Sequence, residues 1–415
     1  MDEIEIPHYF LCPISLQIMK DPVTAVTGIT YDRESIERWL KTPAAAAAAA
    51  VCPVTKQPLP RAASDLTPNH MLRRLIQAWC VVNADSGVDR IPTPKSPVRR
   101  SLILKLVRDV SRINSVSLNG VALKKLEEIA DEGEKNQKLM AEAGVAKAMV
   151  SFIVRCFKDV RNVGIDTALR ILHLTWGPTS SEAKKIMVGE NLDFVESLIW
   201  VLTIDAENTG LNTQALSVLK NVIEVANYSL IEGLNTEFFE KMVEFLRMNI
   251  SPAATRAAIQ ILTETCKLGR SKTKIVEAGA VFELVEMELR NPPEKRTTEL
   301  VFCLLAHLCS FADGRQQLLR HAGGVAVVAK RLLRVSAATD DLALCVLESI
   351  ARYSGTAAVV TEMMRVGGVS KMCMVLQTDC AGYLKKKASG ILRLHSNAWS
   401  NSPCLQVYLL TRCPR

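Results

Sequence analysis

The chain has 415 residues, of which 48% are hydrophobic, 23% charged and only 5% aromatic. This length exceeds one ordinary hydrophobic core, so we expect two or more domains or an array of repeats, with the composition of a mainly helical globular protein. The formal net charge is +8, but eight basic and eight acidic side chains balance within residues 1–80 and no long Lys/Arg run follows, which argues against nucleic-acid binding.

Secretion and membrane insertion are not predicted either. The first ten residues, MDEIEIPHYF, are acidic and lack the apolar stretch of a signal peptide. The longest apolar runs, such as SLIWVLTI, are shorter than the ~18 residues that a membrane span needs. Twelve cysteines occur singly at irregular spacing, which fits buried, reduced thiols better than disulfides. We therefore expect a cytoplasmic protein, with entry into the nucleus left open.

The N-terminal segment has the order of a zinc-binding RING module but not its ligands. LCPISLQIMKDPV is followed by GITYDRESIERWL and then by CPVTKQPL. Two tetrahedral zinc sites need about eight Cys or His ligands in paired spacing. Residues 1–80 offer no Cys-x-x-Cys pair and only the following candidates: His8, Cys12, Cys52, His70 and Cys80. We expect a module that folds without metal.

Polar side chains in the turns are predicted to replace the metal. Asp32 follows the Gly28 turn and is expected to cap the helix that it precedes. That helix places Ile36 and Leu40 on one face with Trp39 beside them. Each hydrogen bond stabilises by about 1 kcal/mol, so a domain of this size needs several. The predicted set that links the loops is Asp21, Asp32, Arg33, Glu34, Thr55 and Asn69.

A second amphipathic helix is predicted over HMLRRLIQAW, with Asn69 as its N-cap. Its apolar residues recur at i, i+3, i+4 and i+7, and they are Leu72, Leu75, Ile76 and Trp79. The module is therefore placed at residues 5–80.

Proline-rich and low-complexity segments separate the predicted domains. NADSGVDRIPTPKSPVRRS indicates a linker, placed at residues 81–101. Thr93 and Ser96 each precede a proline, as in proline-directed phosphorylation sites, but such dipeptides are common in linkers of this composition. The run Ala44–Ala50 is expected to be a tolerated loop or a short helix.

From residue 102 to about 400 the chain repeats. One register of glycines falls at steps of 44–46 residues: Gly144, Gly189, Gly233, Gly279, Gly323 and Gly367. A second register, Ala/Val-x-x-Ile/Val-Leu, recurs with a similar period. A period of ~40–47 residues indicates an α-solenoid of armadillo or HEAT type, here with six to seven units and a tail at residues 401–415. Each glycine is expected to end a helix in the left-handed conformation.

The armadillo units lack the side chains of a nuclear-import groove. Importin-like armadillo proteins carry an asparagine two residues after the second register's leucine. The seven corresponding positions are Glu128, Leu174, Asn221, Glu264, His307, Ser349 and Leu394. Only one of them is asparagine, so other side chains must select a partner.

Together these motifs resemble the plant U-box/armadillo E3 ubiquitin ligases. LCPISLQIMKDPV, GITYDRESIERWL, CPVTKQPL and LTPNHMLRRLIQAW follow the U-box pattern over roughly seventy residues, and a U-box is a zinc-free, α+β relative of RING. The resemblance implies no metal and no cofactor. It implies three partners: a ubiquitin-charged E2 enzyme, ubiquitin, and a protein substrate on the armadillo surface. Oligomers through the U-box and a role in plant stress or defence signalling are further expectations of the resemblance.

The resemblance also implies which residues bind the E2. The first loop, central helix and second loop would supply Cys12, Pro13, Ile14, Leu16, Trp39 and Pro53. Lys56 matches a basic residue that contacts both E2 and ubiquitin, a bridging role that the planar fork of arginine fits better.

The residues themselves leave alternatives open. Ile14 could face the core or a partner, and so could Trp39. Cys12 could be a nucleophile, but no His or acid is placed to lower its pKa, so a structural thiol and a ligase without covalent intermediate are preferred. The competing function is a non-enzymatic armadillo scaffold.

Overall fold

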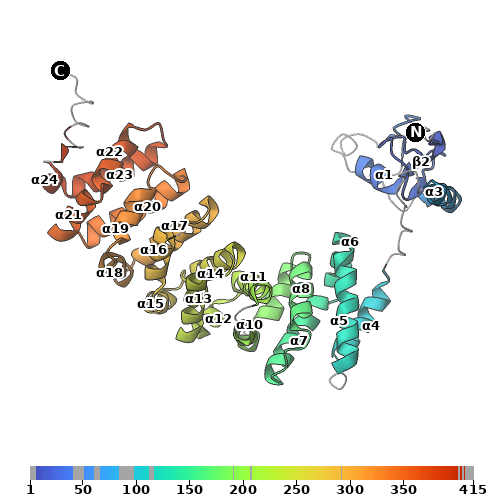
Figure 1. The fold of residues 1–415 in the computed structure, drawn as a ribbon, viewed down its shortest axis with the longest axis horizontal. Coiled ribbons are helices and arrows are strands. Elements are labelled where there is room, and N and C mark those ends of the chain that lie inside the picture. The colour runs from blue at the N-terminus through green and yellow to red at the C-terminus, as the bar shows by residue number, and fades with distance from the viewer. Residues whose placement is uncertain are drawn as a thin grey trace. The chain divides into compact units, whose positions relative to one another are not determined.

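The computed structural model describes residues 6–40, 51–59, 66–83, 98–111, 116–189, 191–205, 208–290, 292–400, 402–403 and 406. The predictions about Ala44–Ala50, Thr93, Ser96 and most of residues 401–415 lie outside this part of the chain. The chain divides into two compact units, residues 1–97 and 98–415 (Figure 1).

The first unit is built on a small antiparallel sheet. Strand β1 (Pro22–Thr24) lies between β2 (Thr30–Asp32) and β3 (Thr67–Pro68), so that Val23 is paired with Tyr31 on one side and Pro68 on the other. A 3-10 turn η1 (His8–Phe10) precedes the sheet. Helix α1 (Arg33–Leu40) follows β2, and α3 (His70–Val82) follows β3.

The core of this unit confirms one predicted helix face and corrects the other. Ile36 of α1 is buried and Leu40 packs against the core, as predicted. On α3, however, Leu75 is 54% exposed, so its placement on the core face is wrong. The inward residues are Leu72, Ile76, Trp79 and Cys80, and this spacing leaves Leu75 at the edge of the buried face, beside Trp79.

The second unit begins with α4 (Arg100–Ser111) and α5 (Val116–Asp131) and continues in three-helix repeats. The first helices of the repeats are α6 (Glu134–Glu142), α9 (Ser181–Val188), α12 (Tyr228–Gly233), α15 (Gly269–Glu277), α18 (Ala312–Arg320) and α21 (Ala357–Arg365). The second helices are α7 (Val145–Lys158), α10 (Leu192–Ile204), α13 (Thr236–Met248), α16 (Ala280–Arg290), α19 (Gly324–Arg331) and α22 (Gly368–Gln377). The third helices are α8 (Ile165–Trp176), α11 (Thr209–Val225), α14 (Pro252–Thr265), α17 (Lys295–Cys309), α20 (Ala337–Tyr353) and α23 (Gly382–Leu394). A short α24 (Ser396–Trp399) follows.

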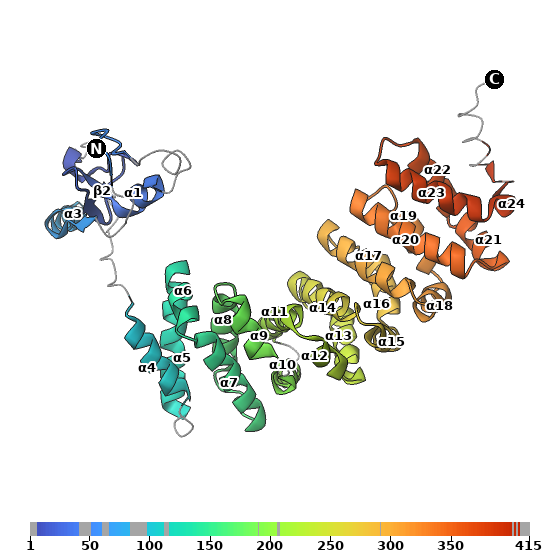
Figure 2. The same cartoon turned by 180° about the vertical axis from the view of Figure 1, so that it is seen from behind.

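Each repeat packs on its neighbours in chain order, as Figure 2 shows. The third helices form a continuous ladder from α8, which contacts α5, to α23, which contacts α20. The buried side chains of all three helices of each repeat join in one hydrophobic core, which extends from Ile103 in α4 to Trp399 in α24. This arrangement confirms the predicted solenoid, in which each unit buries its apolar face on the next. Within the described residues, no helix has both the length and the apolar character to cross a membrane.

The glycine register has two physical origins. Gly144, Gly279 and Gly367 adopt φ of 79°, 87° and 81°, as predicted for left-handed helix ends. For Gly233 and Gly323 the predicted left-handed conformation is wrong. Gly233 ends α12 but does not have a positive φ, and Gly323 has a φ of −98°. There a Cβ would lie 3.3 Å from the side chain of Leu192 and 2.9 Å from that of Leu289, respectively. Close packing between repeats therefore favours glycine at these two positions.

Candidate functional site

The first unit contains two loops of the same geometry, CPISLQ (residues 12–17) and CPVTKQ (residues 52–57). In each loop the cysteine N–H donates to the glutamine carbonyl at 2.8 Å. The fifth residue donates back to the cysteine carbonyl, at 2.8 Å for Leu16 and 3.0 Å for Lys56. Leu16 and Lys56 also share a left-handed backbone, with φ of 56° and 59°. Because residues with a Cβ avoid this conformation, the hydrogen bonds of the loop must hold it, and Leu16 and Lys56 occupy equivalent positions.

A buried sulfur lies at the base of each loop. The thiol of Cys12 accepts a hydrogen bond from the N–H of Asp32 at 3.3 Å. The thiol of Cys52 lies 2.9 Å from the hydroxyl of Tyr31, and it accepts bonds from Thr27 Oγ1 at 3.5 Å and from the N–H of Thr55 at 3.4 Å. These bonds attach both loops to the sheet.

The hydrogen bonds also change the acidity of the two thiols. Burial opposes ionisation of Cys52, but bonds from Thr55, Tyr31 and Thr27 lower its pKa to about 6. Burial and the adjacent Cys52 raise the pKa of Tyr31 above its ordinary value. Burial likewise opposes ionisation of Cys12, and backbone N–H groups of its own loop and of Asp32 lower its pKa overall. Both thiols therefore act as hydrogen-bond acceptors.

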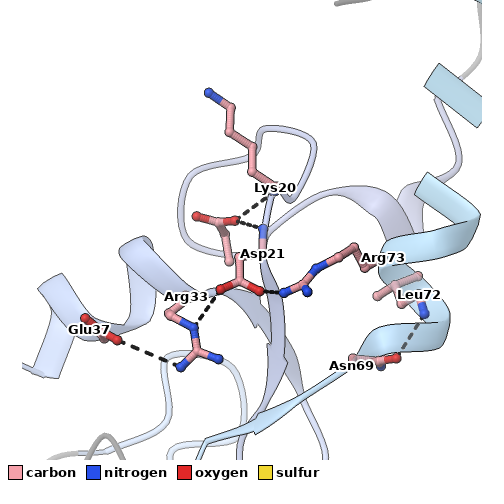
Figure 3. Close-up of polar contacts among 8 residues, drawn as sticks. Lys20, Asp21, Arg33, Glu37, Asn69, Leu72 and Arg73 are labelled. Atoms are coloured by element: carbon pink, nitrogen blue, oxygen red, sulfur yellow. Dashed lines mark hydrogen bonds and ion pairs between the residues drawn. The ribbon is translucent and has the colours of Figure 1, made fainter. Parts of the chain in front are cut away.

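Asp21 connects the loop before β1 to both helices (Figure 3). Its Oδ2 accepts from Arg33 Nε of α1 at 2.7 Å, and its Oδ1 pairs with Arg73 of α3. Arg33 in turn lies 3.9 Å from the carboxylate of Glu37. Arg73 was not among the residues predicted from the sequence, and nothing in the local sequence identifies its partner.

Asp32 and Glu34 have other partners than those predicted. The Oδ1 atom of Asp32 accepts from the backbone N–H groups of Lys20 and Asp21 at 2.8 and 2.9 Å (Figure 3), so the predicted cap of its own helix is wrong. Glu34 pairs with Arg38 one turn along α1 at 2.6 Å, and both side chains are more than 70% exposed. Glu34 therefore does not link the loops. Asn69 caps α3 as predicted, since its Oδ1 accepts from Leu72 N–H at 3.0 Å (Figure 3).

The two loops and α1 present a partly apolar surface to solvent. Pro13 and Lys56 are exposed, Leu16 is 75% exposed and Trp39 36%, while Ile14 and Pro53 are half-buried. The indole Nε1 of Trp39 donates to the carbonyl of Val51 at 3.1 Å, which connects α1 to the second loop. Val54, which is 51% exposed and equivalent to Ile14, was missed from sequence. Cys12 is fully buried, so its predicted direct contact with a partner is wrong.

Comparison with known proteins decides what these two units are. The family model described as "U-box domain" matches residues 6–85, and "Plant U-box protein ARM repeat region" matches residues 103–415. The chain belongs to the plant U-box/armadillo family of E3 ubiquitin ligases.

Relatives of the same length support this assignment. The Arabidopsis thaliana E3 ubiquitin-protein ligase PUB24 is 42% identical over 99% of this chain and 96% of its own length. PUB23 from the same plant is 41% identical over 100% and 98%, and PUB22 is 38% identical over 97% of both chains. The crystal structure of an engineered protein from the Northeast Structural Genomics Consortium, 18% identical, covers 83% of this chain and 82% of its own with a TM-score of 0.54. That likeness concerns the fold alone.

Metal ligands and disulfides do not contribute to this U-box/armadillo ligase in the residues that the structure describes. No group of three or more His, Cys, Asp or Glu side chains in those residues is arranged to hold a metal ion. The ten cysteines of the described part are free thiols, and seven of them are buried.

The armadillo ladder carries a polar pocket of about 330 Å³ where α8, α11 and α14 meet. Its lining includes His173, Gln214, Lys220, Arg256 and Gln260, together with small residues such as Ala253 and Ala257. Lys220 lies 3.2 Å from Glu224, and Arg256 lies 3.6 Å from Glu294. The third helices therefore present amide and cationic groups to this pocket.

Proposed function

We propose that the U-box binds a ubiquitin-charged E2 through Pro13, Ile14, Leu16, Trp39 and Pro53. The observation that carries this proposal is the bond from Trp39 Nε1 to the Val51 carbonyl, because it joins the central helix to the second loop. The two loops have the same hydrogen-bonded geometry, and the bond from Trp39 connects the second of them to α1. Together they form one surface on which apolar side chains of both loops and the indole of Trp39 are exposed. Exposed apolar residues on fixed elements are what a protein partner requires.

Lys56 is proposed to contact both E2 and ubiquitin. Its left-handed backbone is held by the bond from its N–H to the Cys52 carbonyl at 3.0 Å, and its side chain is exposed. An ammonium group at this loop tip can donate to carbonyl oxygens of two partners at once. Such bonds would hold the tethered ubiquitin in one orientation relative to the E2.

The transfer itself needs no covalent step on the ligase. The amine of a substrate lysine attacks the carbonyl of the E2–ubiquitin thioester, an isopeptide bond forms, and the E2 thiolate leaves. Cys12 and Cys52 are both fully buried, so neither can take ubiquitin from the E2. The ligase contributes by holding thioester and acceptor close together, which converts a bimolecular encounter into an intramolecular one.

The armadillo unit is proposed to hold the substrate, with the pocket between α8, α11 and α14 as one contact. The competing function, a scaffold without ligase activity, would not require an exposed Lys56 beside exposed Trp39 and Leu16. Location in the cytoplasm and a role in plant stress or defence signalling are proposed from the family alone. A fluorescent fusion and a loss-of-function plant line would test them.

A U-box-mediated homodimer is proposed on the outward side of α3. Met71, Leu75 and Val82 are exposed there at i, i+4 and i+11, so one apolar stripe runs along the helix. An identical helix in antiparallel orientation presents the same stripe, as a two-fold interface requires. Light scattering of the wild-type chain and of Leu75→Glu tests this, because a wild-type monomer would contradict it.

E2 binding is tested by calorimetry with a panel of E2 enzymes that carry ubiquitin on a non-hydrolysable linkage. Wild type is expected to bind at least one E2, and Ile14→Ala to weaken binding at least tenfold. Val81→Ala, an exposed apolar change on α3, is the matched control and should leave affinity unchanged. Equal binding by wild type and Ile14→Ala would exclude this surface.

A further inference from the structure

A basic pocket lies between the second helices of the last two full repeats, α19 and α22, which contact each other. It has a volume of about 530 Å³. All of its charged lining residues are basic: Lys330, Arg334, Arg365 and Lys371. The lining belongs to α19, α21, α22 and the turns beside them, so this pocket is separate from the one on the third helices α8, α11 and α14.

Within the residues that the structure describes, three of the four cations form no ion pair. Arg365 is bonded to Glu362 on its own helix at 2.6 and 2.8 Å. For Lys330, Arg334 and Lys371, the described part of the chain places no carboxylate within ion-pairing distance. Lys371 interacts at longer range with Asp340, whose carboxylate also accepts the N–H of Leu333 at 2.6 Å. Lys330 and Arg334 add positive charge that no carboxylate of the described residues pairs with, so the pocket attracts anions.

The start of α22 also borders the pocket. Gly367 lines the pocket, and its N–H donates to the Met364 carbonyl at 3.0 Å. Gly367 adopts the left-handed conformation and has no side chain with which to cap the helix. The N-terminal end of a helix carries a partial positive charge that attracts anions. An anion in this pocket would thus meet ammonium and guanidinium groups beside the positive end of a helix.

We propose that this pocket binds the phosphate of a phosphorylated serine or threonine in a partner protein. A phosphomonoester carries close to two negative charges and three acceptor oxygens, which match a cluster of four basic side chains better than one carboxylate does. Guanidinium and ammonium donors form strong charge-assisted bonds with such a group. Met374 is the one large exposed apolar side chain in the lining of the pocket. A single such side chain is not an apolar surface that could enter a bilayer, so a protein partner is favoured over a membrane. The site would let phosphorylation decide which proteins dock on the array, independently of E2 binding.

The test uses the full chain and a mixture of phosphothreonine peptides with randomised flanking residues, observed by ³¹P NMR line broadening. We expect binding by wild type, at least tenfold weaker binding by Arg334→Ala/Lys371→Ala, and unchanged binding by Lys386→Ala. Lys386 is an exposed lysine of α23 outside the pocket, so it controls for general loss of charge. Thermal melting and self-ubiquitination of the double variant should match wild type, because neither residue belongs to the proposed E2 surface.

Inorganic phosphate and vesicles of phosphatidylcholine with 5% phosphatidylinositol 4-phosphate form two further arms. Phosphate that binds as tightly as the peptides would reduce the site to one for the free ion and overturn the proposal. Binding to the vesicles without binding to the peptides would assign a lipid and overturn it as well. Absence of peptide binding, or equal binding by the double variant, would have the same consequence.

Discussion

The hydroxyl of Tyr31 lies 2.9 Å from the thiol of Cys52, and both side chains are fully buried. Tyr31 belongs to β2 and Cys52 to the second loop, so this contact attaches the loop to the sheet. A zinc-free U-box thus uses sulfur as a hydrogen-bond acceptor where a RING uses sulfur as a metal ligand.

Tyr31→Phe should loosen the second loop. The substitution removes one buried donor from Cys52 and is expected to cost about 1–2 kcal/mol of unfolding free energy. Hydrogen–deuterium exchange of the full chain should then rise in peptides that cover residues 51–59. Thr24→Val is the control, because it removes a hydroxyl bonded to Thr30 rather than to the loop. If exchange in the loop rises equally in both variants, the bond from Tyr31 is not what holds it.

The second loop should become more stable as the pH rises from 6 to 9. The pKa of Cys52 is lowered from its ordinary value of 9.0 to about 6, so the folded state binds fewer protons than the unfolded state in this range. The stabilisation is fully present above pH 9 and is lost as the pH falls through 6. The raised pKa of Tyr31 acts only above pH 10. Exchange measured at pH 6, 7, 8 and 9 should therefore slow with pH, after correction for the intrinsic rate.

Cys52→Ser is the control for that experiment, because a serine hydroxyl does not ionise in this range. Its corrected exchange should be nearly independent of pH. A slope as steep as that of wild type would show that another group is responsible.

The two arginines of the U-box helices should differ in importance. Arg73 pairs with the half-buried Asp21, and only 15% of its side chain is exposed. Arg73→Ala should therefore cost about 1–3 kcal/mol. The exposed Arg38, paired with Glu34, should change stability by less than about 0.5 kcal/mol when it is replaced by alanine. The unfolding free energy of the U-box in each variant is measured by urea titration, with unfolding followed by hydrogen–deuterium exchange of U-box peptides. An equal loss of free energy in Arg73→Ala and Arg38→Ala would contradict the role given to Asp21.

Two glycines of the array should respond to alanine in opposite directions. A Cβ at Gly314 would lie 2.1 Å from the Leu308 carbonyl oxygen, so Gly314→Ala must displace α18 from α17. We expect a loss of more than about 3 kcal/mol, since backbone cannot move aside cheaply. Gly390 in α23 meets no atom within 4 Å, and Gly390→Ala should stabilise by about 0.5–1 kcal/mol. Thermal unfolding of both variants measures these changes in stability. A Gly314→Ala variant as stable as wild type would contradict the close packing of α18 on α17.

The armadillo array could be predicted because its information is local and repeated. Two sequence patterns with one period predict where the helices of each repeat lie. The packing of a single glycine, such as Gly323 against Leu289, depends on a neighbouring repeat and could not be predicted in this way. In the U-box the long-range partners escaped prediction. Arg73 is 52 residues from Asp21, and no local pattern connects them. The sequence does carry one signal of this kind: CPISLQ and CPVTKQ share three of six residues, Cys, Pro and Gln, and this predicts equivalent loops and equivalent thiols.

Helix periodicity alone could not place Leu75. The positions i, i+3, i+4 and i+7 from Leu72 describe a stripe that is wider than the area α3 buries on so small a sheet. The sequence therefore predicts the helix and its cap at Asn69, but the tertiary contacts decide which of its apolar residues is left for a partner.

The central claim is tested most directly by ubiquitination in vitro with E1, a panel of E2 enzymes, ubiquitin and the full chain. Wild type should form conjugates with at least one E2. Ile14→Ala and Trp39→Ala should lose at least nine-tenths of the rate, while Arg38→Ala, also on α1, should keep it. Melting of the armadillo unit should be unchanged in all three variants. Full activity in Ile14→Ala and Trp39→Ala would contradict the assigned surface, and a wild type inactive with every E2 would favour the scaffold.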